Sequence, residues 1–204
     1  MQTYSRNING IRFSLNVEEV LLSQTEVLWN ALSEIPADSI TDGYKIQIGF
    51  SVFILCRSTD GFTVKTPDYS ASPLTDITND LSMAFLIQME QADLLKEFDI
   101  ESCSVRFDDK ITVAKDVFQK SQFYLQHSEN NDGSGWRIDE FTQNDNGGYS
   151  YVETADYTKI YAYQLIDLCP ELLKVLVLPY NYTAIMIDDE LVDILNENNK
   201  SLID

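Results

Sequence analysis

Residues that could carry nucleophilic or metal-dependent catalysis are scarce in this sequence, and His127 is its only histidine. A Ser-His-Asp or Cys-His arrangement would have to use that one imidazole, and the chain holds no GxSxG motif to present a nucleophile to it. A zinc site of the HExxH type needs two histidines. His127 is therefore interpreted as a surface or core residue, and the sequence predicts no catalytic residue and no enzyme.

Cysteines and loop motifs add no recognisable site. Cys56, Cys103 and Cys169 lie far apart without any CxxC pair, which favours buried thiols over a zinc or redox motif. No phosphate-binding GxxxxGKS/T or GxGxxG loop occurs. A calcium loop beginning at Asn130 would need Glu at its twelfth position, where Phe141 stands. The sequence thus predicts no metal and no cofactor, although 33 acidic residues leave a glycosidase-type carboxylate pair open.

The densest acidic feature lies near the C-terminus and is the candidate partner-binding site. The sequence predicts a terminal helix over Leu191–Asn198, and on a helix Asp189, Asp193 and Glu197 would share one face. Such like charges destabilise a helix unless solvent or a basic partner offsets them. Acids ahead of a helix also stabilise its N-terminus, and this capping role is the favoured of the two interpretations. The residues are Asp188, Asp189, Glu190, Asp193 and Glu197.

The net charge of the chain is −19, from 14 basic and 33 acidic residues. A field of this sign repels nucleic-acid phosphates and anionic membrane surfaces, because both are bound through Lys and Arg. It attracts a basic partner, although solubility alone accounts for the charge equally well. The polar residues 1–10 lack the apolar segment of a signal peptide, so we expect a cytoplasmic protein that binds neither nucleic acid nor membrane.

The first half of the chain predicts a unit of helices and strands at residues 1–103. Apolar residues recur at helical spacing over Val17–Ile35, ahead of Pro36. Strands rich in Ile, Val and Phe follow between Tyr44 and Lys65, with a turn at 59–61. A second helical period covers 81–98, although its apolar opening would also suit a buried strand.

The second half predicts another unit, at 104–204, with shorter elements. Together the halves predict an α+β fold of mixed short strands and helices, in one or two compact units. Asn- and Gly-rich clusters supply the positive-φ positions of turns at 130–135 and 144–148. The expected elements are a hairpin of 104–107 with 111–114, strands at 122–126 and 183–187, and helices at 161–168, 171–178 and 191–198.

Two short motifs follow one another in the segment from Ile111 onward: Ile-Thr-Val-Ala-Lys-Asp-Val at 111–117 and Asp-Gly-Ser-Gly-Trp-Arg at 132–137. They resemble the signature I-x-V-S-K-x-V followed by D-S-G-W-R of the immunity protein thirty-three family. The later Tyr163-Gln164-Leu165 and Cys169-Pro170-Glu171 resemble its short helix and D-P-E turn. The motif residues are taken as structural: Ser134, Gly135, Trp136 and Pro170.

This resemblance implies an antidote encoded beside a bacterial toxin, which it neutralises by direct protein–protein association. The implied partner is a cognate toxin, and the acidity of the chain suits a toxin with a basic surface. Two other hypotheses stay open behind this one: an acidic interaction or regulatory module without a toxin, and a carboxylate-dependent hydrolase. The identity of the toxin, the interface and the oligomeric state do not follow from the sequence.

Overall fold

A computed structural model describes residues 1–129, 133–144, 148–152 and 156–203. The chain folds as two compact units, Met1–Glu90 and Gln91–Asp204. The division falls inside helix α2 (Ser82–Phe98), ahead of the boundary expected after residue 103.

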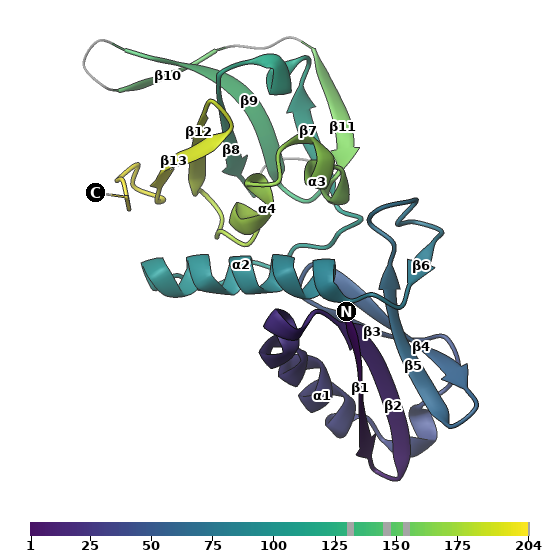
Figure 1. Cartoon of the computed structure of the whole chain (residues 1–204). Helices are drawn as coiled ribbons and strands as arrows, with labels where there is room; N and C mark the ends of the chain where they lie inside the picture. The colour runs from purple at the N-terminus through teal and green to yellow at the C-terminus, as the bar shows by residue number, and fades with distance from the viewer. Residues whose placement is uncertain (130–132, 145–147, 153–155, 204) are drawn as a thin grey trace. The chain divides into compact units, whose positions relative to one another are not determined.

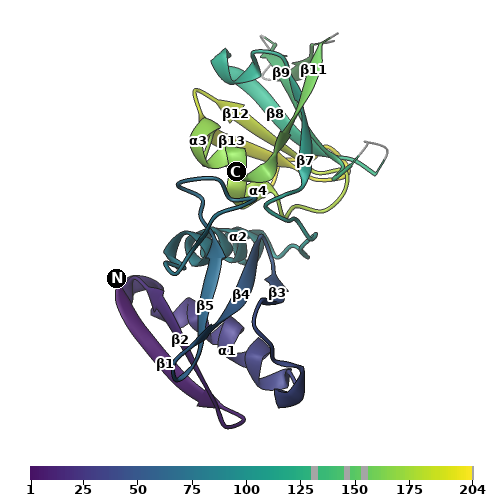
Figure 2. The ribbon, with the colours of Figure 1, turned by 90° about the vertical axis from the view of Figure 1, so that its right-hand side faces the viewer.

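Unit 1 is built on a six-stranded sheet in the order β1-β2-β5-β4-β3, with β6 paired to β5 (Figures 1 and 2). Only the contact of β2 with β5 is parallel. Ser58 and Gly61 face each other where β4 turns into β5. A Cβ at Gly61 would lie 2.0 Å from the Arg12 carbonyl oxygen, so glycine is required there. The elements are β1 Gln2–Ile8, β2 Ile11–Val17, α1 Thr25–Glu34, β3 Tyr44–Ile48, β4 Ser51–Ser58, β5 Gly61–Pro67 and β6 Ile77–Thr78.

Alternation along the strands of unit 1 places their apolar side chains on one face, where α1 covers them. Phe13 and Leu15 of β2 are fully buried beside Leu28 of α1. Phe53 of β4 stacks on Phe85 of α2, with ring centroids 5.3 Å apart. The hydrophobic core of this unit therefore lies between the sheet and its helices.

Unit 2 contains a seven-stranded sheet in the order β11-β7-β9-β8-β12-β13, with β10 paired to β9. Among the strands described in unit 2, only β7 and β9 pair in parallel. Two short helices lie against the sheet and bury leucines such as Leu165 and Leu172 (Figures 1 and 2). The elements are β7 Lys110–Ala114, β8 Gln122–His127, β9 Trp136–Gln143, β10 Tyr149–Tyr151, β11 Tyr157–Tyr161, α3 Leu165–Leu168, α4 Leu172–Val175, β12 Thr183–Ile187 and β13 Glu190–Leu195.

The predicted α+β fold of short strands and helices is wrong. Of the described residues, 39% are in strands and 26% in helices, and two large sheets organise the chain. The main cause is an unrecognised hairpin at the N-terminus, in which Asn9 and Gly10 take positive φ and join β1 to β2. In the sequence, strand β2 of this hairpin is indicated by the alternation that places apolar residues at Ile11, Phe13 and Leu15.

The other expected elements match the structure unevenly. The 81–98 pattern forms α2, and 183–187 forms β12. The helix predicted from Val17 begins only at Glu19, as a 3-10 turn, because Val17 still belongs to β2. The hairpin of 104–107 with 111–114 is absent among the described residues, since β7 pairs with β9 and β11 instead. The expected turns at 130–135 and 144–148 fall partly outside the described residues.

The predicted terminal helix at 191–198 is also wrong, because residues 191–195 belong to strand β13. Asp188 and Asp189, with φ of 50° and 64°, form a two-residue connection between Ile187 of β12 and Glu190 of β13. Positive φ at both central residues is the geometry of a type I′ hairpin turn. Separately, no helix in the described part of the chain is long and apolar enough to cross a membrane.

Candidate functional site

The Ser-Gly-Trp motif sits where β8 turns back into β9, and its glycine is required by close packing. Gly135 has φ +82°, and a Cβ there would lie 2.7 Å from the Ser128 carbonyl oxygen and 3.1 Å from Cδ2 of His127. Ser134 donates a hydrogen bond of 2.6 Å from its hydroxyl to the Lys110 carbonyl. The motif therefore brings the first residue of β9, Trp136, opposite the last residue of β8.

Three aromatic rings stack outward from this motif to the protein surface. The His127 ring lies 4.0 Å from the Trp136 ring with an interplanar angle of 10°, and 4.1 Å from the Tyr180 ring with an angle of 33°. His127 and Trp136 are each 1% exposed, whereas Tyr180 is 42% exposed. The buried part of the stack thus supports an aromatic ring that faces solvent.

Both nitrogens of His127 meet backbone carbonyl oxygens. Nδ1 lies 2.8 Å from the oxygen of Leu178 and Nε2 lies 3.2 Å from that of Ser134. Burial lowers the pKa of His127 below its ordinary value, against the opposing effect of these carbonyls. The backbone amide of His127 donates to Tyr182, and that of Asn181 donates to His127. His127 is therefore a core residue that holds the 179–182 turn.

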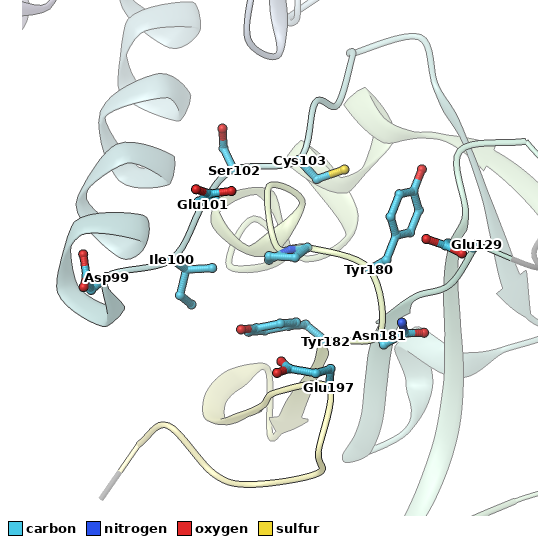
Figure 3. A pocket seen from close by; sticks show the side chains of 11 residues that line it. Asp99, Ile100, Glu101, Ser102, Cys103, Glu129, Tyr180, Asn181, Tyr182 and Glu197 are labelled. Carbon is cyan, nitrogen blue, oxygen red and sulfur yellow. The ribbon is translucent and has the colours of Figure 1, made fainter.

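That turn forms one wall of an open cavity of about 560 Å³ in unit 2 (Figure 3). The other walls come from residues 99–103 after α2, from the end of β8, and from the segment after β13. Asp99 has φ 52° and the Ile100 amide donates to Leu95, which ends α2 in a Schellman-type cap. The polar and aromatic side chains of the lining that matter below are Asp99, Glu101, Glu129, Glu197, Tyr180 and Tyr182.

The cavity is negatively charged. Its lining includes four exposed carboxylates and no Lys or Arg side chain. Within the described residues, none of these four carboxylates takes part in a salt bridge. Burial, and then the neighbouring charge and hydrogen bond of Glu197, raise the pKa of Tyr182. Two tyrosine rings and four uncompensated carboxylates together favour a cationic ligand.

The acids predicted as a partner-binding run do not lie on one helix face. Asp188 and Asp189 lie in the exposed β12–β13 turn, and Glu190 begins β13. Asp193 is only 9% exposed, and its carboxylate accepts hydrogen bonds from Ser201, at 2.6 Å, and from Tyr149. Of the five, Glu197 alone contributes to the lining of the cavity. Their role in partner binding stays a prediction, without the helix that motivated it.

A second carboxylate constellation, unmarked in the sequence, lies inside unit 2. Asp139 is fully buried, and its carboxylate accepts hydrogen bonds from Arg137 at 2.5 Å and from the Tyr157 hydroxyl at 2.6 Å. The guanidinium also lies over the Tyr157 ring, 4.6 Å from its centroid. These donors stabilise the ionised carboxylate, so the arrangement suits a structural ion pair. The strand alternation alone could not reveal it, because both charged residues read as solvent-facing.

Pro170 lies just ahead of the short helix α4. The Leu173 amide donates to its carbonyl, and α4 begins at Leu172. Cys169 is buried, and its burial raises the pKa of its thiol to about 11. Sequence reasoning missed Tyr180, Tyr182 and Glu129, although Pro179-Tyr180-Asn181 carries an ordinary turn signal.

Comparison with known proteins identifies the family. Residues 90–197, more than half of the chain, match the Imm33-like domain, and every residue that lines the cavity falls within that range. No curated protein and no solved structure matches the chain. The resemblance expected from the Ser-Gly-Trp motif is thereby confirmed. The chain belongs to the family of proteins with an Imm33-like domain.

Proposed function

We propose that this protein is an immunity protein that neutralises a cognate bacterial toxin by binding it directly. The observation that carries the proposal is the match of residues 90–197 to the Imm33-like domain. This range includes most of unit 2, with the acidic cavity and the aromatic stack behind it. A protein of this class acts by occupying its target, so a binding surface is the feature its structure must supply.

The charge of the molecule supports a toxin with a basic surface as the partner. At a net charge of −19 the protein attracts cations over a distance set by the Debye length, about 8 Å at physiological ionic strength. Complementary charge raises the association rate, which matters for an antidote that must capture a toxin before it acts. The three free cysteines fit a reducing compartment, and we place the encounter in the cytoplasm.

Co-expression with the toxin domain encoded beside this gene tests the proposal. We expect the cells to survive, and the two proteins to co-purify as a complex whose association slows as salt is raised. A toxin domain whose activity is already abolished by mutation serves as the bait for co-purification, so that binding is measured without selection for survival. If the inactive toxin domain forms no complex with this protein, and the active toxin kills cells that express it, the chain is instead an acidic interaction module that does not bind this toxin.

A further inference from the structure

We propose that the acidic cavity of unit 2 is the anchoring pocket for an arginine side chain of the partner. The inference deepens the proposed function, since it states the chemistry by which a toxin would be held. It rests on that function only for the identity of the partner. The pocket itself is defined by residues of this chain, at the lining described above.

The charges around the cavity favour a basic side chain as the ligand. The four carboxylates come from three separate segments, so their charges surround the cavity instead of forming one exposed run. In Figure 3, Glu129 and Tyr180 lie on one side, and Asp99 and Glu101 lie on the other. With no cation in the lining, a basic side chain that enters gains attraction from several directions.

The two tyrosine rings of the lining, Tyr180 and Tyr182, also favour a cation. The Tyr180 ring packs against the buried His127 ring, which itself stacks on Trp136, so contacts within the protein position Tyr180 before a ligand binds. Figure 3 shows Tyr182 beside Glu197, and these two interact directly. A cation above a tyrosine face and within reach of a carboxylate is stabilised by both groups at once.

The spread of the carboxylates around the cavity favours an organic cation over a metal ion. A metal ion needs several oxygen ligands around one point. Within the described residues, no three His, Cys, Asp or Glu side chains converge in that way. Carboxylates spread around a cavity of about 560 Å³ instead suit an extended, planar cation with several donors. Guanidinium fits this better than ammonium, because it stacks on aromatic rings and donates to two carboxylates in a fork.

The walls of the pocket are preorganised by backbone hydrogen bonds. The Cys103 amide donates to Val177 at 2.7 Å, which ties the segment after α2 to the chain that leads into the 179–182 turn. The Asn181 amide donates to His127 at 2.7 Å, and that turn also contains Asn181 at φ 69°. A pocket that is already formed loses less entropy when it takes up a ligand.

The direct test titrates the whole 204-residue chain with N-acetyl-arginine amide as the probe and follows binding by two-dimensional amide NMR. We expect saturable shifts at residues 99–103 and 179–182, with a dissociation constant in the millimolar range. N-acetyl-citrulline amide has the same shape without the charge and is expected to cause no saturable shift there. Equal responses to the two probes, or shifts confined to other residues, overturn the proposal. So does tighter binding of N-acetyl-lysine amide or of Ca²⁺ than of the arginine probe.

Variants locate the binding to named side chains. The double variant Glu129→Gln/Glu197→Gln is expected to weaken arginine binding by roughly fivefold, since an exposed ion pair contributes only modestly to binding. Asp167→Asn removes one exposed charge outside the cavity and should leave the binding unchanged. Tyr180→Ala should weaken binding and Tyr180→Phe should not, because the ring face is what the cation contacts. Equal binding by the double variant and the wild type contradicts the assignment.

A parallel measurement with the toxin domain keeps the two proposals distinguishable. If the toxin binds and Glu129→Gln/Glu197→Gln binds it as tightly as the wild type does, the pocket is not the anchor, whereas the immunity function stands. If the arginine probe binds in the pocket and the toxin does not bind, the immunity function fails and the pocket chemistry stands.

Discussion

At the scale of single residues, Gly135 and His127 link the family motif to the candidate site. The sequence alone indicates a structural role for the motif, and the structure shows what it positions: a glycine with no room for a Cβ, and a tryptophan at the buried end of the aromatic stack. Neither Gly135 nor His127 lines the cavity. Substitutions at these positions should therefore change stability first, and binding through the position of Tyr180.

We predict that Gly135→Ala destabilises the fold strongly. The left-handed φ costs about 1–2 kcal/mol for a residue with a Cβ, and the 2.7 Å approach to the Ser128 oxygen forces a backbone shift on top of it. Gly133→Ala is the matched control, since its φ is +83° while its nearest atom would be 3.5 Å away. Thermal unfolding should show a clearly larger loss for Gly135→Ala. Equal losses of stability in the two variants would mean that the close contact at Gly135 does not add to the destabilisation.

We also predict that His127 titrates below its ordinary pKa of 6.5, because burial disfavours the imidazolium. As the only histidine, it gives one set of ring resonances, so an NMR pH titration measures it directly. At pH values between the lowered pKa of the folded protein and the ordinary pKa of the unfolded chain, the unfolded chain binds more protons at His127 than the folded protein does. His127 therefore makes the free energy of unfolding fall as the pH drops through this window. His127→Gln should remove that component. A measured pKa of 6.5 or above contradicts the prediction.

At the scale of elements, the connection between β12 and β13 decides how the acidic run is arranged. The sequence favours a helix there because Leu191, Ile194 and Leu195 fit a helical period. In the structure they belong to a strand, with a register shift between Ile185 and Met186 of its partner. Such short apolar runs do not separate strand from helix by periodicity alone. The two-residue turn decides the outcome, and its Asp-Asp sequence is a weaker signal than Asn-Gly.

We predict that Asp188→Asn/Asp189→Gly stabilises the protein by about 0.5–1 kcal/mol. Both positions have positive φ, which glycine and asparagine tolerate better than aspartate, and the change also removes two negative charges. Chemical denaturation measures the effect. Asp188→Ala/Asp189→Ala removes the same charges without favouring positive φ, and should destabilise. Stabilisation by the alanine pair would show that charge repulsion, not turn geometry, dominates.

The site is less predictable from sequence than the motif. Long periodic segments such as α2 follow from the sequence because a helical period sustained over 17 residues outweighs the strand-like apolar run at its start. The cavity depends on Asp99, Glu129, Tyr180 and Glu197, which come from four places in the chain. The pairing of β12 with β8 and β13 brings Glu129, Tyr180 and Glu197 together, and the backbone hydrogen bond from Cys103 to Val177 adds the segment of Asp99. The residue pattern of a single sequence does not reveal these pairings. The ion pair of Asp139 and Arg137 is hidden for a different reason, because both residues lie on the strand face that the alternation assigns to solvent.

At the scale of the whole molecule, the charge of −19 and the acidic cavity act on different aspects of binding. The overall field steers a basic partner and is screened by salt, so it governs the association rate. Contacts inside a cavity govern how long the partner stays. A surface charge far from the cavity and a carboxylate within it should therefore have different kinetic signatures.

The most direct measurement is the kinetics of binding between this protein and an inactivated form of the cognate toxin domain that we propose as its partner. We predict fast association that slows as salt rises from about 50 to about 500 mM, and a dissociation rate that Glu129→Gln/Glu197→Gln raises at every salt concentration, on the order of fivefold. Asp167→Asn should leave dissociation unchanged. Absence of binding at low salt would contradict the immunity function, and unchanged dissociation of the double variant would contradict the arginine pocket.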